Sequence, residues 1–442
     1  MVKSINALEK EFRQITPNSF SQWQLGKPVM PGGVIKGAYW NYPYPIYAKR
    51  AEDCYVWDLD GRRYLDFANH HTTTILGHSH PGVLKAVQKE VQKGLGLGMP
   101  TTLEAEMATE ICSRFKSIDR VRFTNSGTEA TLHVTRLVKA LTGKVKVAKF
   151  EGAYHGSHDA LEVSVFPPID KAGPDDAPSS VAAWKGMAVG SEENVVVLPY
   201  NQPESVELIL KEHQHEIAAV FYDGKPGIYD VPVEFTRFLR KLTKELGIIM
   251  VMDEIVSFRV GYSGYQGICG VEPDLTTFGK IVGGGLPVGA IGGKAKYMDV
   301  FDNTQGAPLV GQSGSFSGNS LTLAAGLATL RGLTPEVYQH LEELRPKLHN
   351  GLLDVFERFK IPCKVVSQGN TVSFYITDQP VTDFRSAAIV PDTELHGRLT
   401  LALLLKGHLI HGGLGMTISA PMAVKHLDDF LGALSEVLQE QD

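Results

Sequence analysis

The stretch that decides the fold is "GIIMVMDE", residues 247–254. It is a run of five apolar residues that ends in two carboxylates. A strand that is apolar on both faces belongs inside a sheet that helices cover. Similar short apolar runs alternate with stretches of helical periodicity at 145–150, 194–200, 217–223 and 274–278. We therefore predict an α/β protein built on a mostly parallel sheet.

The hydrophobic pattern is different on both sides of this region. "CYVWDLDGRRYLDF" alternates apolar and polar residues around an Asp-Gly turn, which predicts a hairpin. After about residue 320 the sequence is rich in helical patterns, followed by short strands and a final helix, which indicates a smaller α+β domain. We expect an N-terminal segment of the small domain at 1–75, the large domain at 76–325, and the C-terminal part of the small domain at 326–442.

Composition excludes several classes of protein. The chain has 442 residues, 43% of them hydrophobic and 21% charged, which is ordinary for a soluble globular protein. A net charge of −6 argues against a nucleic-acid or anionic-membrane partner. The four cysteines are scattered, which favours free thiols in a reducing compartment. Because we find neither an apolar signal core nor a run of about 18 apolar residues, we expect a cytoplasmic protein.

The ends of the predicted strands carry candidate functional residues, since ligands of a parallel α/β sheet bind beyond the carboxyl ends of its strands. Ser126, Gly127 and Thr128 begin a predicted helix, where free N–H groups and the helix dipole can hold an anion. Alone, this motif is more often an ordinary N-cap. Asp253 ends a wholly apolar strand and is costly to bury unless a cation meets it. Lys280 also stands at a strand end, in "TTFGKIVGGG", although a surface lysine beside a flexible loop would look the same.

Another strand ends at Tyr154-His155-Gly156, where an aromatic ring can cover a flat ligand. A zinc site at His155 and His158 lacks further ligands at metal-site spacing, so we expect no metal. An anion cradle, an aromatic plate, a buried acid and a buried lysine together match pyridoxal phosphate. Its phosphate takes a helix N-terminus, its ring is stacked, its protonated nitrogen pairs with an acid, and its aldehyde forms a Schiff base with lysine.

The motifs resemble those of the class III aminotransferases, within the fold-type I pyridoxal-phosphate superfamily. Glutamate-1-semialdehyde aminomutase and the β-amino-acid and ω-transaminases are the most similar by motif. Order and spacing agree over roughly residues 30–330 and more loosely to the end, in "VWDLDGRRYLDF", "LGHSHPGVLKAV", "RFTNSGTEA", "YHGSHDA", "VMDEI", "TTFGKIVGGGLPVGAIGG" and "GSFSGNSLTLAAG". The resemblance implies a seven-stranded sheet flanked by helices in a large cofactor-binding domain, a small domain built from both termini, and pyridoxal 5'-phosphate as cofactor.

The resemblance also implies roles for individual residues. Lys280 is similar to the family's Schiff-base lysine, and Asp253 to the acid that meets the ring nitrogen. Ser126, Gly127 and Thr128 are expected to hold the phosphate, and Tyr154 and Ile255 to cover the two faces of the ring. His155 is also expected in the cofactor-binding set. Ser315, in "GSFSGN", takes the place of a residue that usually crosses to the partner subunit's phosphate. We therefore expect a homodimer with composite active sites.

The expected substrate side departs from the family pattern. Many members carry an arginine for the substrate carboxylate, whereas the nearest cation here is Lys36, with aromatic residues such as Trp40 beside it in sequence. If these residues line the site, the pocket is broad and apolar with one cation at its edge. Otherwise the aromatic residues pack the small domain and Lys36 is solvated. The loop at 222–231 is shorter than the family's Glu-Pro loop and has Asp223 in the glutamate's place.

The resemblance implies a transaminase that acts on small amine and carbonyl substrates. It would move an amino group between an amine or a β- or ω-amino acid and a keto acid, aldehyde or ketone, by a ping-pong mechanism. One alternative is an aminomutase or an amino-acid racemase or epimerase, which needs no external acceptor. Another is a non-catalytic cofactor-binding protein, against which the intact pair of Lys280 and Asp253 argues.

Overall fold

The computed structural model describes residues 2–388, 393–410 and 415–440. The chain divides into two units, which we call the first and the second unit. The first unit comprises Met1–His80, Gln339–Pro380 and Ile389–Asp442. The second unit comprises Pro81–Tyr338 and Val381–Ala388.

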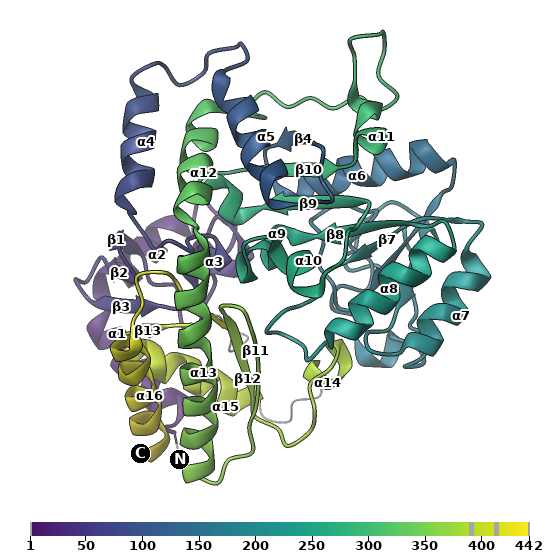
Figure 1. The fold of residues 1–442 in the computed structure, drawn as a ribbon. Helices are drawn as coiled ribbons and strands as arrows, with labels where there is room; N and C mark the ends of the chain where they lie inside the picture. The colour runs from purple at the N-terminus through teal and green to yellow at the C-terminus, as the bar shows by residue number, and fades with distance from the viewer. Residues whose placement is uncertain (1, 389–392, 411–414, 441–442) are drawn as a thin grey trace. The chain divides into compact units, whose positions relative to one another are not determined.

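The second unit is built on the predicted seven-stranded sheet (Figure 1). Its strands, in spatial order, are β4 (Arg120–Thr124), β10 (Gly289–Gly293), β9 (Leu275–Gly279), β8 (Ile249–Asp253), β7 (Ile217–Tyr222), β5 (Lys146–Phe150) and β6 (Val195–Leu198). Neighbouring strands from β9 to β6 are parallel, whereas β10 is antiparallel to both β9 and β4. Every residue of β7, β8 and β9 is buried. The apolar runs therefore predicted the central strands correctly.

Helices cover both sides of this sheet, and Figure 1 shows α6 on one side of β7–β10 and α8 on the other. α6 begins where the Ser126 side chain caps it and ends at Gly143, which has the left-handed conformation that suits a helix terminus. Its buried face includes Ala130, Val134 and Leu137. The helices of the second unit are α4 (Pro81–Val91), α5 (Thr102–Arg114), α6 (Gly127–Thr142), α7 (Pro203–His213), α8 (Val233–Glu245), α9 (Glu254–Ser257), α10 (Gly264–Cys269), α11 (Ala295–Met298), α12 (Ser320–Gly332) and α14 (Phe384–Ala388).

The strand register places the candidate residues at one edge of the sheet. Tyr222 at the end of β7 is level with Met252, and Asp253 is level with Thr277. The residues that follow β7, β8 and β9 therefore leave the sheet at the same carboxyl edge. Ligands of parallel α/β sheets bind at this kind of edge.

The first unit combines two small sheets with helices. One sheet has the order β1 (Ala48–Glu52), β2 (Tyr55–Asp58), β3 (Arg63–Asp66), β13 (His408–Leu409), and the other β11 (Lys364–Gln368), β12 (Thr371–Tyr375), β14 (Gly415–Thr417). The predicted hairpin is confirmed, because β2 pairs with β3 in antiparallel register. The helices are α1 (Ile5–Ile15), α2 (Pro17–Gly26), α3 (Asn69–Thr72), α13 (Pro335–Arg358), of which the first residues belong to the second unit, α15 (Thr393–Leu405) and α16 (Val424–Gln439).

The bounds of the second unit differ from the predicted range 76–325. The unit includes the whole of α12, which packs on α4 and α5, and continues to Tyr338. It also includes 381–388, which were expected in the small domain. Backbone groups hold this segment, since the Asp230 N–H donates to the Val381 carbonyl at 2.9 Å and the Asn201 amide to the Thr382 carbonyl at 2.7 Å.

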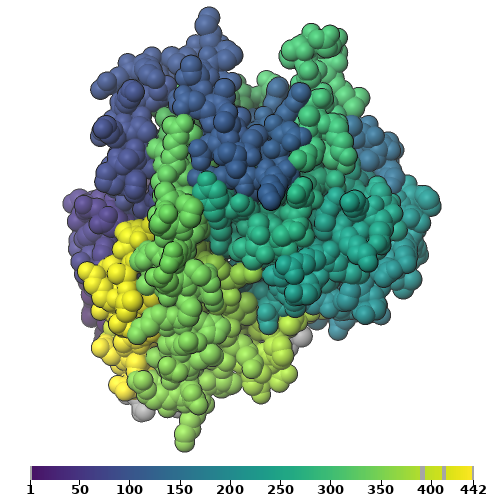
Figure 2. Space-filling view, in the orientation of Figure 1, coloured from purple at the N-terminus to yellow at the C-terminus, as the bar shows by residue number. Residues whose placement is uncertain are grey.

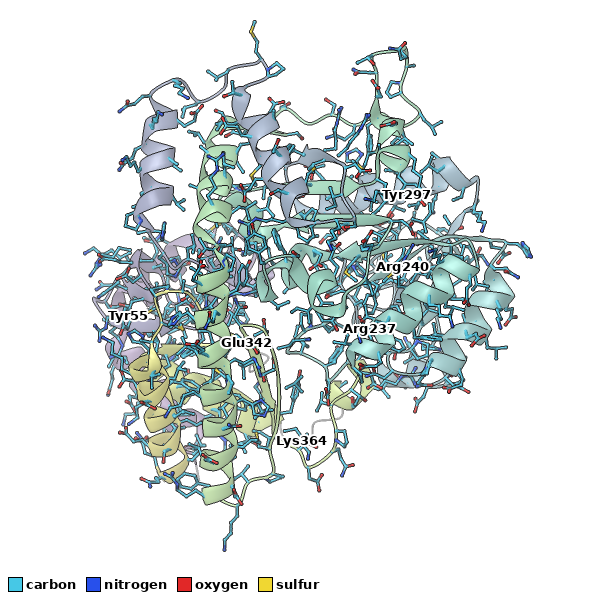
Figure 3. The ribbon with its side chains drawn as sticks, viewed as in Figure 1. Tyr55, Arg237, Arg240, Tyr297, Glu342 and Lys364 are labelled. Carbon is cyan, nitrogen blue, oxygen red and sulfur yellow. The ribbon has the colours of Figure 1, made fainter. Side chains whose placement is uncertain are left out.

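The second unit also has two projecting loops and a partly buried ion pair at the amino end of β9. The loops after α4 and after α11 project from it (Figure 2), and they carry the exposed apolar side chains Leu95, Met99, Leu309 and Phe316. At the amino end of β9, the Asp274 carboxylate accepts hydrogen bonds from Arg240 at 2.7 Å and from the Tyr297 hydroxyl at 3.1 Å. Arg240 and Tyr297 are labelled in Figure 3. None of the helices in the described part of the chain has the length and hydropathy needed to span a bilayer.

Candidate functional site

Asp253 ends β8 and is almost completely buried. Its Oδ2 lies 2.7 Å from His155 Nδ1, and its Oδ1 accepts hydrogen bonds from the Ile255 N–H at 3.0 Å and the Thr277 hydroxyl at 3.1 Å. Burial by itself would raise the pKa of Asp253, but the bonds from His155, Ile255 and Thr277 more than offset it and hold the pKa below the ordinary value. The carboxylate is therefore kept ionised inside the protein.

His155 connects Asp253 to the loop that follows β5. Its Nδ1 contacts the carboxylate, and its Nε2 is buried without a partner among the described residues. The nearby His158 has a different role, because its Nε2 lies 3.2 Å from the Thr131 hydroxyl on α6. The two histidines thus have separate protein partners, and neither shares a cluster that could hold a metal within the described residues.

Lys280 follows β9 at the same edge and is partly buried. Its φ of 51° lies in the left-handed region, which is uncommon for a residue with a side chain and is found at functional sites. Burial lowers the pKa of its amine to about 8, although the nearby carboxylates of Asp253 and Asp223 favour the charged form. A lysine with this pKa has a substantial uncharged fraction near neutral pH, so its amine can act as a nucleophile or a base.

Asp223 and Lys225 form a buried ion pair just beyond β7. The Lys225 amine lies 3.2 Å from Asp223 Oδ2, and the Lys225 N–H donates to Asp223 Oδ1 at 3.0 Å. Lys225 has a positive φ of 47°, like Lys280. Its charge is one of the causes that lower the pKa of Lys280. The loop at 222–231 therefore adds a second cation to this edge of the sheet.

The start of α6 has free backbone donors beside a close side-chain contact. The first N–H groups of a helix have no intrahelical acceptor, so those of Gly127 and Thr128 are available to an anion. The Ser126 hydroxyl already accepts the Glu129 N–H at 3.2 Å. A Cβ at Gly127 would lie 2.6 Å from Cδ1 of Ile255, so a larger residue there would have to displace the Ile255 side chain. Ile255 thus packs between the start of α6 and the end of β9.

Tyr154 and Ser315 are the more exposed members of the predicted cofactor set. Tyr154 is 47% exposed, and its hydroxyl lies 2.9 Å from the Ser157 hydroxyl. Ser315 lies in an exposed turn. The neighbouring Gly314 approaches the segment just before α6 of its own chain, since a Cβ there would lie 2.7 Å from Nδ2 of Asn125. The Ser315 turn and the start of α6 are therefore near each other within one subunit, and the predicted role of Ser315 across a dimer stays a prediction.

The predicted substrate residues Lys36 and Trp40 belong to the first unit. The Lys36 amine lies over the Tyr39 ring, 4.1 Å from its centroid, and Tyr39 in turn stacks on His71. Trp40 packs at a tilt on Trp23 with ring centroids 5.6 Å apart, and it remains partly exposed. The aromatic residues around Lys36 therefore do pack within the first unit. Their contribution to a substrate site stays a prediction.

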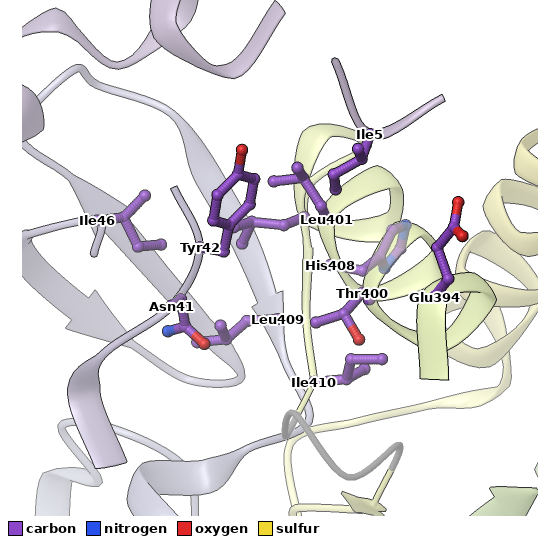
Figure 4. A pocket seen from close by; sticks show the side chains of 12 residues that line it. Ile5, Asn41, Tyr42, Ile46, Glu394, Thr400, Leu401, His408, Leu409 and Ile410 are labelled. Carbon is purple, nitrogen blue, oxygen red and sulfur yellow. The ribbon is translucent and has the colours of Figure 1, made fainter. Parts of the chain in front are cut away.

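A separate hollow of about 450 Å³ lies inside the first unit, between α15, β13 and the 41–46 segment (Figure 4). Its lining is mainly aliphatic, with Ile5, Leu401 and Ile410 among its residues. None of the described lining residues is a lysine or an arginine. The hollow therefore lacks both a nucleophilic amine and a cation for a carboxylate, and it does not resemble the predicted site.

Several residues at the sheet edge were not predicted from the sequence. Thr277 holds Asp253, and Lys225 pairs with Asp223 beside Lys280. Glu254 is fully buried, which raises its pKa to about 7, and it accepts the N–H groups of Tyr265 at 3.1 Å and of Gln266 at 2.9 Å. The charged residues of "YDGKPG" and "MDEI" directly follow apolar strands, a position that indicates buried charge. The sequence does not tell which of these charges face the site.

The site as a whole fits pyridoxal phosphate. It offers a lysine amine with a lowered pKa, an ionised buried aspartate, and free N–H groups at a helix N-terminus. Register places the amine and the aspartate on adjacent strands, and Ile255 links both to the start of α6. Such a set can hold a phosphate, keep a ring nitrogen protonated and bind an aldehyde.

Comparison with known proteins agrees with a site for pyridoxal phosphate. The sequence matches the aminotransferase class-III family over residues 37–411. It is 37% identical to a glutamate-1-semialdehyde 2,1-aminomutase from Heliobacterium modesticaldum, over 93% of this chain and 94% of the relative. The structure is similar to that of an omega-transaminase from Sphaerobacter thermophilus, with a TM-score of 0.92 and 36% identity over 95% of this chain and 97% of the other. It is also similar to a transaminase with PLP bound, with a TM-score of 0.87 and 32% identity over 96% and 98% of the two chains.

Proposed function

This chain belongs to the class-III aminotransferase family, and we propose that it is a transaminase. It is an enzyme that uses pyridoxal 5'-phosphate. In the proposed reaction an amine or a β- or ω-amino acid donates its amino group, and a keto acid, aldehyde or ketone receives it. The observation that carries the proposal is the placement of Lys280 beside the ionised Asp253 at the carboxyl edge of the sheet.

Each residue of the site has a defined part in the proposed mechanism. The bound cofactor supplies an electron sink for the carbon that carries the amino group. Asp253 stays ionised and would meet the ring nitrogen, while the N–H groups of Gly127 and Thr128, with the Ser126 and Thr128 hydroxyls, would hold the phosphate. Tyr154 and Ile255 would cover the ring, and His155 orients Asp253 through its Nδ1.

Lys280 is the proposed catalytic base. In the resting enzyme its amine would hold the cofactor. During turnover the free Nζ would take up and return the proton of the substrate carbon. Because the pKa of Nζ is about 8, this amine can both take up and release a proton near neutral pH. A second carbonyl substrate reverses these steps, so the kinetics are ping-pong.

An aminomutase is the second candidate, and the name of the Heliobacterium modesticaldum relative favours it. An aminomutase, like a racemase or epimerase, turns over one substrate without an external acceptor. The test is a panel of amine donors, including glutamate-1-semialdehyde and β-amino acids, with and without a keto acid. A transaminase gives stoichiometric transfer only when the acceptor is present. Turnover of a single substrate without acceptor would replace the proposal with the aminomutase.

We also propose a homodimer with composite sites. The exposed apolar side chains on the projecting loops after α4 and α11 support it, because such surfaces are typical of interfaces. Mixing Lys280→Ala subunits with subunits disabled at Ser315 should restore about a quarter of the wild-type sites if subunits exchange at random. If both residues act within one subunit, mixing restores nothing. A fully active monomer in light scattering would also refute the dimer.

A further inference from the structure

Arg385, on the short helix α14, makes an unusually complete set of contacts within the second unit. Its guanidinium pairs with Glu151 through two bonds, from Nε at 2.8 Å and from Nη2 at 3.0 Å. It also donates to the carbonyls of Ala172 at 2.9 Å, Gly173 at 2.8 Å and Pro174 at 3.1 Å, and to the Asp175 carboxylate. One side chain thus connects three segments that are far apart in the sequence.

The Glu151 carboxylate is buried, so its partner determines where it lies. Glu151 is the first residue after β5 and only 4% exposed. A buried carboxylate without a cation is costly, and a bidentate guanidinium fixes both its position and its orientation. Arg385 therefore anchors the beginning of the loop 151–157, which carries Tyr154 and His155.

Other contacts hold the same loop at both ends. Gly152 has a φ of +73°, and a Cβ there would lie 2.4 Å from Cβ of Phe384, so α14 packs directly on the loop. The Gly152 N–H donates to the Ser164 carbonyl at 2.9 Å. At the far end, the Ser157 N–H donates to the Thr128 hydroxyl at 3.2 Å. The loop is thus fixed by α14 at its start and by α6 at its end, with His155 between them.

We propose that Arg385 is a positioning residue of the cofactor site. Through Glu151 it holds the 151–157 loop so that Tyr154 covers the ring and His155 Nδ1 stays on Asp253. The inference rests on the cofactor roles proposed above for Tyr154, His155 and Asp253. Arg385 itself does not touch the reacting atoms. A residue with a merely structural role would stabilise the second unit without affecting the order of this loop or the affinity for the cofactor.

Two measurements on the apoenzyme distinguish these roles. The first is hydrogen exchange of the amides of 151–157, and the second is the dissociation constant for added pyridoxal phosphate, followed by absorbance. In Arg385→Gln we expect exchange of these amides to be at least about tenfold faster and cofactor binding at least about tenfold weaker. Arg385→Lys keeps the charge but loses the bidentate geometry, so it should restore part of both values.

Arg240→Gln is the matched control. Arg240 forms an ion pair with Asp274 of similar burial in the same unit, but at the amino end of β9. We expect this variant to lower stability while exchange in the loop and cofactor affinity remain within about twofold of wild type. If Arg385→Gln does not fold because Glu151 is left unpaired, Glu151→Gln combined with Arg385→Gln removes both charges and should loosen the loop in the same way.

The proposal is overturned if a folded Arg385→Gln, or the double variant, keeps both values within about twofold of wild type. This failure is distinct from failure of the proposed function. Neither measurement depends on turnover or on the amine donor, whereas the transaminase proposal is decided by the substrate panel. A loose loop in an enzyme that proves to be an aminomutase would still support the role of Arg385.

Discussion

Asp253→Asn is the substitution that best separates a functional aspartate from a structural one. In the structure, Oδ1 of Asp253 accepts bonds from the Ile255 N–H and the Thr277 hydroxyl, and an asparagine carbonyl can accept both. The amide nitrogen would then face His155 Nδ1, which can become the acceptor by a change of tautomer. All three bonds lose the charge of the carboxylate, but the variant no longer buries a charge, so we expect a loss of only about 1 kcal/mol in the free energy of unfolding.

The expected effect on catalysis is larger. The variant cannot offer a negative charge to the ring nitrogen of the bound cofactor, and a hydrogen bond to a charged group contributes about 1.5–3 kcal/mol. If that contribution is made in the transition state, kcat/KM falls about ten- to hundredfold. The assay is steady-state transamination with a saturating acceptor, combined with thermal unfolding of the apoenzyme.

Thr277→Val is the control for this substitution. It removes one of the three hydrogen bonds to Asp253 but leaves the charge of the carboxylate, so we expect only a few-fold loss of kcat/KM. A near-normal rate in Asp253→Asn, or equal losses in the two variants, would show that the charge of Asp253 has no part in catalysis.

The pH dependence of stability gives an independent check. Because the pKa of Asp253 is lowered in the folded protein, its charge stabilises the wild type above the ordinary aspartate pKa of about 3.9, and this stabilisation is lost as pH falls through the folded pKa. Asparagine has no such contribution. The difference in the free energy of unfolding between wild type and Asp253→Asn should therefore shrink below about pH 4. A difference that is constant from pH 7 to pH 3 would contradict the lowered pKa.

Three further predictions follow from the site. The rate at which the apoenzyme reloads pyridoxal phosphate should rise with pH through about 8, the pKa of Lys280. Lys225→Met should move this midpoint to higher pH, because it removes a neighbouring positive charge. An unchanged midpoint would contradict the proximity of the two lysines. Gly127→Ala should weaken cofactor retention and cost about 1–3 kcal/mol of stability, measured by dialysis and thermal unfolding, because the new methyl group would lie 2.6 Å from Cδ1 of Ile255. Lys36→Met should raise KM for carboxylate-bearing substrates and spare simple aryl amines, and equal effects on both classes would exclude Lys36 from the substrate site.

The sequence by itself determined the strands and the chemistry of their ends. β7 and β8 were predicted because their runs are apolar on both faces, and only a strand covered on both sides has that composition. Once parallel order is assumed, residues that follow neighbouring strands must share an edge, so Asp253 and Lys280 could be grouped without coordinates. The start of α6 was predicted for a similarly local reason, because Ser126 caps the helix by accepting the N–H of Glu129, three residues further on.

Only the tertiary structure decided which distant residues support these groups. Thr277 reaches Asp253 because β8 and β9 are in register, and Arg385 reaches Glu151 although 234 positions separate them in the sequence. The left-handed backbone of Lys225 and Lys280 and the pKa of the Lys280 amine likewise depend on what packs around them. The hydrophobic periodicity of a helix or strand indicates which of its residues are buried, because it depends on that element alone. It does not indicate the partner of a buried charge, because the partner lies on another element and depends on how the elements pack.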